Sequence, residues 1–158
     1  MDELDRCYAS GLRILKYRFN SAADLRRKLR AKGFDRETID ATLTRLTREK
    51  WLDDDRYAAA YVRSRVLKSK GRLRIRRELM VAGVDDETIA RAVGENVDAD
   101  DERERASAVA RRRLPILVSR YGEQAARNKL TAYLLKQGYE AALVREIVDE
   151  TRVLSPRA

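Results

Sequence analysis

The chain of 158 residues is 44% hydrophobic and 39% charged, and its 35 Lys and Arg against 26 Asp and Glu give a net charge of +9. With no His and one cysteine, Cys7, the sequence excludes an intrachain disulfide and argues against a transition-metal site or a His-based catalytic dyad. The basic balance favours a polyanionic partner. We expect no cofactor, and a cytoplasmic protein that does not enter a membrane, because no leader-like start or long apolar run is present.

Apolar residues recur at three- and four-residue steps and not at two, which predicts an all-helical chain. The buried face of the first helix is expected to consist of Leu4, Tyr8, Leu12, Leu15 and Phe19. Ser21, followed three residues later by Asp24, is typical of a helix start, and Asp35 is expected to cap the third helix. Phe34 and Trp51 are expected in the core.

One pattern occurs three times along the chain: an apolar residue, three others, Leu, three others, Gly and an apolar residue. The copies span residues 25–34, 75–84 and 130–139. Each copy predicts a helix that ends at its Gly, because a residue without a Cβ adopts the left-handed conformation of a helix C-terminus at no steric cost. The helix that follows begins DRETI after the first copy and DDETI after the second, 50 residues later.

These spacings predict three tandem three-helix repeats that form an elongated, curved helical array. We place repeat 1 at residues 1–51, repeat 2 at 52–97, and repeat 3 with a tail at 98–158. A single repeat of this size buries little apolar surface, so neighbouring repeats are expected to pack together. Pro115 is expected to break or kink the seventh helix, because its ring clashes with the preceding turn.

The centre of repeat 2 carries a basic run. Between Arg56 and Arg77 there are nine Lys and Arg and no Asp or Glu. A surface built for solubility alone interleaves both signs of charge, so the basic run predicts contact with a polyanion or an acidic protein. Its candidate binding residues are Arg63, Arg65, Lys68, Lys70, Arg72, Arg74, Arg76 and Arg77.

Two further basic clusters lie outside repeat 2. The cluster of repeat 1 lies on its second helix and consists of Arg26, Arg27, Lys28, Arg30 and Lys32. The cluster in repeat 3 consists of Arg111, Arg112 and Arg113. If the repeats share an orientation, these clusters would line one edge together with the basic run and could follow a chain of phosphates. A solvated surface is the simple alternative for any single cluster.

Other readings of the same residues are possible. A helix, a Gly turn and a second helix also resemble a DNA-reading helix-turn-helix, but the helices that would read bases open with acids, which repel phosphates. Tyr57 and Tyr61 share a helix face and could stack on single-stranded bases, although core packing is the simpler role for most aromatics. The acidic runs at 53–55 and 98–101 are explained by helix starts, where carboxylates complement the helix dipole.

Four motifs follow one another over about residues 4 to 150: DLRRKL from Asp24, LDDDRYA from Leu52, IRREL from Ile75 between Gly71 and Gly83, and LLKQGY from Leu134. Together they resemble the RecX family of RecA modulators. The resemblance implies three tandem three-helix repeats without catalytic residues. It also implies binding along the groove of the RecA–DNA filament, which restrains RecA ATP hydrolysis and strand exchange in recombination, DNA repair and the SOS response.

Three functions stay open at this point: a regulator of the RecA filament, which we favour, a general nucleic-acid-binding helical protein, and a structural adaptor without DNA contact. For the first we expect a monomer that contacts single- and double-stranded DNA without sequence preference. Arg72, Arg76 and Arg77 are expected at the surface, so that replacing all three by Ala keeps the fold and weakens filament binding. Leu79 is expected in the core.

Overall fold

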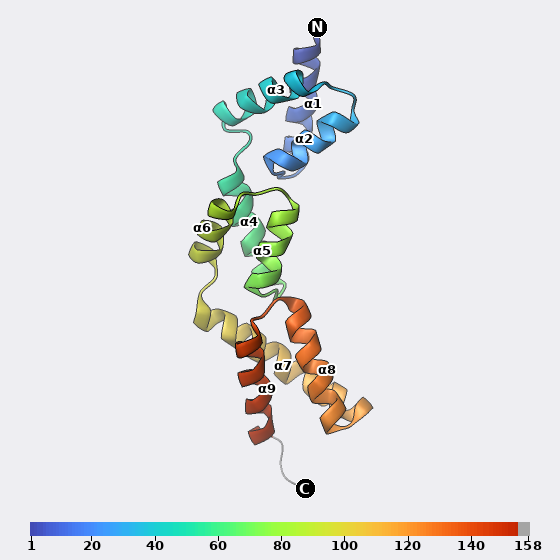
Figure 1. Cartoon of the computed structure of the whole chain (residues 1–158), viewed down its shortest axis with the longest axis vertical. Coiled ribbons are helices and arrows are strands. Elements are labelled where there is room, and N and C mark those ends of the chain that lie inside the picture. Colours follow the sequence, from blue (N-terminus) through green and yellow to red (C-terminus); the bar gives the residue numbers. More distant parts are fainter. Residues whose placement is uncertain (155–158) are drawn as a thin grey trace. The chain divides into compact units, whose positions relative to one another are not determined.

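The computed structural model describes residues 1–154, and the side chains of residues 1–151. Over these residues the chain forms nine α-helices and no strand, which confirms the all-helical prediction (Figure 1). The helices are α1 Glu3–Tyr17, α2 Ala22–Ala31, α3 Arg36–Arg48, α4 Asp54–Leu67, α5 Arg72–Val81, α6 Asp86–Asn96, α7 Ala99–Tyr121, α8 Glu123–Gln137 and α9 Ala141–Leu154. The tail predicted after residue 154 lies outside the described residues. None of the described helices is both long and apolar enough to span a membrane.

The predicted helix starts are confirmed by their side-chain caps. The Ser21 hydroxyl accepts a hydrogen bond from the Asp24 backbone N–H (3.1 Å), and the Asp35 carboxylate accepts one from the Thr38 N–H (2.8 Å). Asp85 repeats the second arrangement at the start of α6. Each cap satisfies an N–H group that the first helical turn leaves without an intrahelical acceptor.

The thrice-repeated Gly pattern forms the same helix C-terminus each time. The Gly has a positive φ, of 95°, 79° and 98° in the three copies, and the next N–H turns back onto the carbonyl of the pattern's Leu. The three bonds run from Phe34 to Leu29 (3.4 Å), from Val84 to Leu79 (3.1 Å) and from Tyr139 to Leu134 (3.3 Å). This is the Schellman motif, which places the apolar residue after the Gly beside the last helical turn.

The helices group into two compact units. Unit 1 comprises Met1–Tyr61 and Glu78–Ala92, and unit 2 comprises Val62–Arg77 and the chain from Val93 onward. Helices α4 and α5 therefore each contribute to both units. The core of unit 1 is built mainly from α1, α2 and α3 and contains Cys7, Leu25, Leu29, Ile39, Leu43, Leu46 and Leu52. The core of unit 2 contains Ala106, Val109, Ala110, Leu130, Leu134, Tyr139, Val144, Ile147 and Val148.

Within unit 1, the Gly corner at the end of α5 packs against the start of α2. The Ser21 hydroxyl donates a hydrogen bond to the Ala82 carbonyl (2.5 Å), one of the acceptors left over at the end of α5. A Cβ on Gly83 would lie 2.3 Å from the Cβ of Ala23, so only glycine fits this approach. The Ala22 N–H donates to the Asp54 carboxylate (2.8 Å), which adds the start of α4 to the same joint.

Unit 2 contains the equivalent joint between the start of α5 and the Gly corner of α8. The Gly71 N–H donates to the Gln137 carbonyl (2.8 Å), and the Leu73 N–H donates to the Gly138 carbonyl (3.0 Å). Two N–H groups at the start of one helix are thus satisfied by carbonyls at the end of another, which also aligns the two helix dipoles favourably. The backbones meet without intervening side chains, because a Cβ on Gly71 would lie 2.4 Å from the carbonyl group of Gly138.

Tyr139 anchors this joint from the core of unit 2. Its hydroxyl donates a hydrogen bond to the Ser69 carbonyl (2.6 Å), and burial is the main cause that raises its pKa above the usual 10.0. We expect Tyr139→Phe to lower the free energy of unfolding by about 1–2 kcal/mol at neutral pH, because the Ser69 carbonyl loses its donor. Urea denaturation of both proteins measures the difference.

The alkaline limb of the same experiment tests the pKa of Tyr139. A pKa raised in the folded state gives a stability contribution that is complete below pH 10, the unfolded value, and is lost as pH rises through the folded value. The wild-type protein should therefore lose stability above about pH 10 faster than Tyr139→Phe. A stability difference between the two that stays constant with pH would contradict the assignment.

Two aromatic residues and Leu4, which is 41% exposed, differ from the predictions, and of the break or kink expected at Pro115 the break does not occur. Trp51 is 46% exposed, so its assignment to the core is wrong: Leu52, at 2% exposed, takes the core position instead. Phe19 lies beyond the end of α1 and is 58% exposed. Phe34 is partly buried against the core of unit 1, as predicted. Pro115 lies inside the continuous helix α7 and does not break it. Proline has no N–H to bond the carbonyl one turn earlier, but this stretch of α7 is exposed, so water can bond that carbonyl instead.

Candidate polyanion-binding surface

The candidate binding residues of the basic run, Arg63–Arg77, all belong to unit 2. They lie on the last turns of α4, on the connection that follows and on the first turns of α5. The connection is short because α4 also ends in a Schellman motif, here with a serine in place of the glycine. Ser69 takes the left-handed conformation (φ 58°), and the Lys70 N–H donates a hydrogen bond to the Arg65 carbonyl (3.0 Å). The sequence thus concentrates the charge at one corner of unit 2.

Four residues of the basic run are exposed at this corner: Arg63, Lys68, Arg76 and Arg77. We call them the exposed basic set. Arg63 has one long hydrogen bond, of 3.5 Å, to the Asn96 side chain, and none of the four has a carboxylate within salt-bridge distance among the described residues. A group of cations without neutralising carboxylates raises the local potential and attracts phosphate groups.

The other members of the run are half-buried and contribute to the structure of unit 2. The Lys70 ammonium donates to the Gln137 side-chain oxygen (2.6 Å), and the Cβ of Arg74 packs against the Gly138 corner. Arg65 is also half-buried. The prediction that Arg72 is a surface position is wrong. Its guanidinium forms a salt bridge of 2.8 Å with Glu102, whose side chain is 3% exposed.

The basic cluster of repeat 1 lies in unit 1 and is largely paired. Arg26 forms a salt bridge with Asp40, Arg27 forms one with Asp24 (3.0 Å), and the Lys28 ammonium donates to the Asn20 side chain (2.5 Å). Arg30 is exposed. These carboxylate and amide groups reduce the repulsion among the cations of α2. Fewer cations of this cluster are therefore available to a polyanionic partner than the sequence alone indicates.

The basic cluster of repeat 3 lies on α7 in unit 2. Arg111 pairs with Glu104 (3.0 Å), Arg112 is exposed, and the Arg113 guanidinium lies 3.7 Å over the ring of Tyr133. The expectation that clusters of different repeats line one edge stays a prediction.

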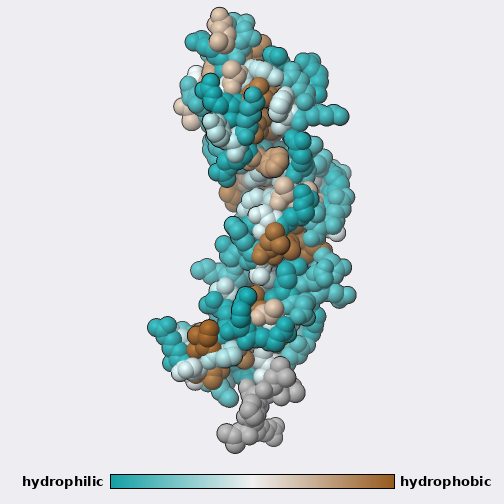
Figure 2. Space-filling view, turned by 180° about the vertical axis from the view of Figure 1, so that it is seen from behind, coloured by the Kyte–Doolittle hydropathy of each residue, from teal (hydrophilic) through white to brown (hydrophobic). Residues whose placement is uncertain are grey.

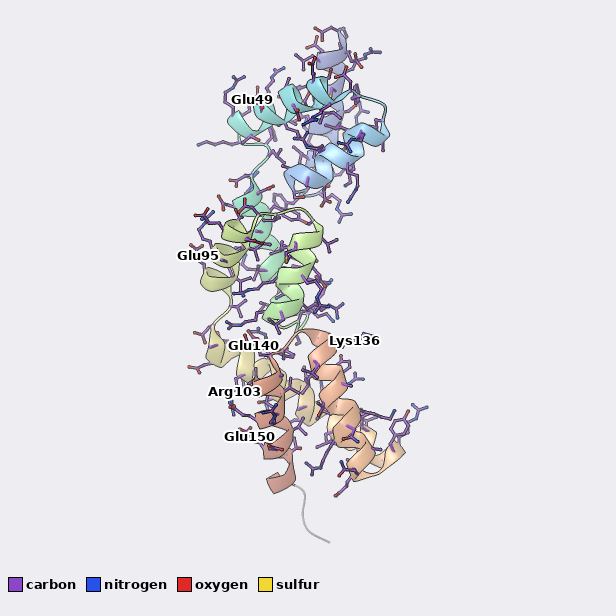
Figure 3. All side chains as sticks on the ribbon, in the orientation of Figure 1. Glu49, Glu95, Arg103, Lys136, Glu140 and Glu150 are labelled. Carbon is purple, nitrogen blue, oxygen red and sulfur yellow. The ribbon has the colours of Figure 1, made fainter. Side chains whose placement is uncertain are left out.

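One ion-pair network in unit 2 was missed by the sequence reasoning. Arg103 on α7 binds both Glu146 and Glu150 on α9, which are one helical turn apart (Figure 3). A spacing of four residues between two acids on an exposed helix face is the only sequence signal for such a network, and it does not name the arginine. Arg103 is thus engaged in structure and is not a candidate for binding.

Hydrophilic residues cover most of the molecular face seen in Figure 2, and hydrophobic residues form only small separate patches on it. Nine helices over the described residues, with repeated glycine corners and a set of exposed cations in unit 2, define a helical-repeat protein.

Comparison with known proteins identifies the family. The family model described as "RecX, first three-helix domain" matches residues 7–46, and the model described as "RecX, second three-helix domain" matches residues 53–93. The regulatory protein RecX of Amycolatopsis mediterranei is 36% identical over 87% of this chain and 78% of its own length, and that of Trichlorobacter lovleyi is 32% identical over 91% and 94%. The chain belongs to the RecX family, whose curated members are named regulatory proteins.

Solved structures show that the fold agrees with this assignment. The crystal structure of RecX from Lactobacillus salivarius superposes with a TM-score of 0.81 over 95% of this chain and 97% of its own, at 23% sequence identity. A second structure of a regulatory protein RecX gives a TM-score of 0.83 over 94% of this chain and 72% of its own, at 24% identity. The helical-repeat architecture is therefore shared although most side chains differ.

Proposed function

We propose that this protein is a non-enzymatic, monomeric regulator that binds the RecA–DNA filament in the cytoplasm and restrains RecA ATP hydrolysis and strand exchange. It serves recombination, DNA repair and the SOS response in this role. Membership of the RecX family supports the regulatory part of the proposal. The observation that supports a DNA-bound filament as partner is the exposed basic set of unit 2, which no described carboxylate neutralises.

A general nucleic-acid-binding role is the second candidate, because the same cations would bind single- and double-stranded DNA without RecA and without sequence preference. RecA ATP hydrolysis on single-stranded DNA, measured while this protein is titrated in, separates the two. A regulator lowers the hydrolysis rate at concentrations far below one molecule per DNA site, whereas a competitor for DNA must first cover the DNA. A protein that binds neither DNA at about 50 mM salt nor the filament would be a structural adaptor.

We expect the triple variant Lys68→Ala, Arg76→Ala and Arg77→Ala to retain its fold and to inhibit RecA more weakly. All three residues belong to the exposed basic set. The salt dependence of filament binding should become shallower by about 0.9 in the log–log slope for each phosphate contact that is removed. Circular dichroism checks the fold, and binding titrations at several salt concentrations give the slope.

The matched control removes the same charge elsewhere. Arg6, Arg13 and Arg48 are exposed positions of unit 1 outside the three basic clusters, and their replacement by Ala lowers the net charge equally. This control should inhibit RecA nearly as well as the unchanged protein. Equal losses in both triple variants would mean that total charge, and not the corner of unit 2, governs binding.

A further inference from the structure

Unit 1 has two adjoining hollows beside the connection between α1 and α2. The first has a volume of about 500 Å³ and the second about 380 Å³, which is within the range of small-molecule sites. Phe19 and Asn20 line both hollows. The two hollows therefore adjoin at Phe19 and Asn20, and we call them together the recess; they lie outside the exposed basic set of unit 2.

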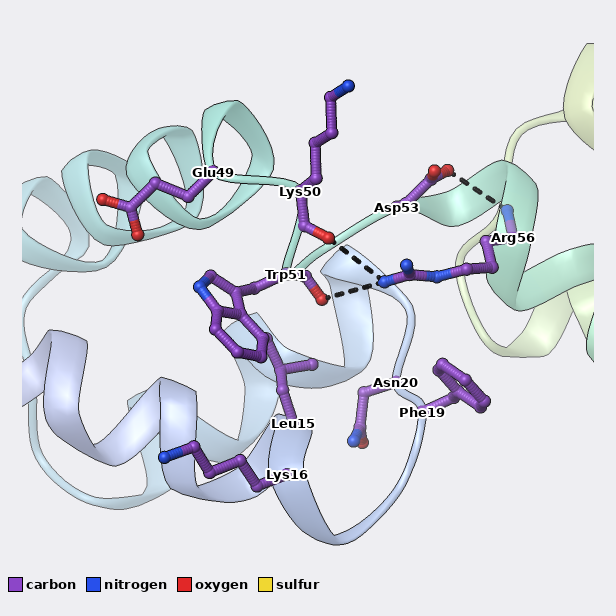
Figure 4. Close-up of a pocket in the computed structure, with 9 residues that line it drawn as sticks. All are labelled: Leu15, Lys16, Phe19, Asn20, Glu49, Lys50, Trp51, Asp53 and Arg56. Atoms are coloured by element: carbon purple, nitrogen blue, oxygen red, sulfur yellow. Dashed lines mark hydrogen bonds between the residues drawn. The ribbon is translucent and has the colours of Figure 1, made fainter.

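The first hollow presents two exposed aromatic rings (Figure 4). Trp51, the single tryptophan of the chain, and Phe19 are 46% and 58% exposed. The Arg56 side chain donates hydrogen bonds to the carbonyls of Lys50 and Trp51, and its guanidinium lies 5.6 Å from the centroid of the Phe19 ring. Lys50, the residue before Trp51, adopts the left-handed conformation (φ 63°) at the end of α3. A lysine in a conformation that favours glycine costs stability, and such strain is concentrated at functional sites.

The carboxylates around the first hollow are already engaged. Glu49 accepts hydrogen bonds from the Tyr8 hydroxyl (2.5 Å) and the Arg45 guanidinium (2.9 Å), and Tyr8, followed by Arg45, holds the pKa of Glu49 below its usual value. Asp53 accepts from the backbone N–H of Arg56 at the start of α4 (3.1 Å). These acids therefore have little capacity left to bind cations of the recess.

Three cations of the recess have no such partners, whereas Arg27 forms a salt bridge with Asp24 (3.0 Å). Within the described part of the chain, no carboxylate lies within salt-bridge distance of Lys16, Arg18 or Lys50. Lys16 and Lys50 line the first hollow and Arg18 lines the second. The recess thus has free positive charge on both sides of Phe19.

The second hollow adds two more aromatic residues. The rings of Tyr57 and Tyr61 lie 6.0 Å apart and are tilted by 31°, and they line the hollow together with Arg18 and Arg27. Burial, followed by the charge of Asp24, raises the pKa of Tyr57 above its usual value. The second hollow therefore combines the cation Arg18 with two further aromatic rings.

We propose that this recess is a binding site for single-stranded nucleic acid, in which bases stack on Phe19 and Trp51 while Lys16, Lys50 and Arg18 contact the phosphates. Proteins that hold single strands without reading sequence use this combination of ring faces and cations. An acidic peptide would use the cations and leave the rings uncovered. The inference rests on the DNA contact of the proposed function and names a second place for it, in unit 1.

The single tryptophan provides a direct test without RecA. Titration with an oligothymidylate of about 12 nucleotides should quench the fluorescence of Trp51, because a base covers its ring. An abasic strand of equal length should bind more weakly and quench the Trp51 fluorescence little. A duplex should also quench it little, because its bases are already stacked on one another. An oligoglutamate peptide that quenches as strongly as oligothymidylate would overturn the nucleic-acid assignment in favour of an acidic protein partner.

Two variants test individual contacts. Phe19→Ala should weaken oligothymidylate binding by about 10-fold, the effect of one lost stacking contact, while its helix content stays the same because Phe19 is exposed. Tyr17→Ala is the matched control, since Tyr17 is 86% exposed, lies two residues away and lines neither hollow. It should bind as the unchanged protein does.

Lys50→Gly removes a cation without adding strain, because glycine favours the left-handed conformation at this position. It should fold at least as well as the unchanged protein and lower the salt slope of single-strand binding by about 0.7. If Phe19→Ala and Lys50→Gly both bind oligothymidylate as the unchanged protein does, the recess is not the site. RecA inhibition is then measured separately with the same two variants, which keep the exposed basic set. Inhibition at the unchanged level would support the proposed function even though the recess binds no single strand.

Discussion

Replacement of Gly138 by Ala is expected to destabilise unit 2 by about 3 kcal/mol or more. Two costs combine at this position. An L-residue at φ +98° costs about 1–2 kcal/mol, and the added methyl group would lie 2.3 Å from the Cβ and 2.4 Å from the backbone nitrogen of Arg74. Because the obstacle includes backbone, the start of α5 must move, and overpacking of this kind costs about 1–3 kcal/mol. Urea denaturation monitored by circular dichroism measures the total.

Gly33→Ala is the control that separates the two costs. Gly33 ends α2 in the same motif with φ +95°, but nothing lies within 4 Å of the position its Cβ would take. This variant should lose only the conformational part, about 1–2 kcal/mol. If both variants lose the same amount, the close approach of α5 to the Gly138 corner is not part of the folded protein in solution.

These two glycines also show how far the sequence could predict the fold. The repeated Gly pattern indicated where α2, α5 and α8 end, because a Schellman motif is encoded by a few neighbouring residues. It could not indicate that the corner at Gly138 meets the backbone at Gly71, while nothing lies within 4 Å of the position that a Cβ on Gly33 would take. That difference depends on contacts between residues far apart in the chain, and no local sequence pattern predicts such contacts.

The same limit applies to the candidate sites. The density of positive charge located the basic corner of unit 2, but charge alone could not distinguish the exposed Arg76 from the paired Arg72, because the partner Glu102 is 30 residues away. The recess in unit 1 was missed because Trp51 was assigned to the core. Leu52, the next residue, takes the core position, and two adjacent apolar residues carry no sequence signal for which of them is buried.

Arg72→Ala is expected to lower the free energy of unfolding by about 3 kcal/mol, in contrast to its neighbour Arg76. The Arg72 guanidinium is the salt-bridge partner of Glu102, whose side chain is 3% exposed. Loss of one partner leaves a buried carboxylate without its counter-charge, which costs about 3–5 kcal/mol, and we expect the lower end because the Arg72 side chain is itself 25% exposed. Thermal or urea denaturation gives the value.

The matched control is Arg76→Ala, on the same helix, which removes an equal charge from an exposed position and should change stability by less than about 0.5 kcal/mol. The double variant Arg72→Met with Glu102→Leu should recover most of the loss, since apolar residues of similar size can replace a buried ion pair at little cost. Equal stability of Arg72→Ala and Arg76→Ala would mean that the pair with Glu102 contributes nothing to unit 2. Arg72 would then be free for a polyanion, and the binding surface would have to include it.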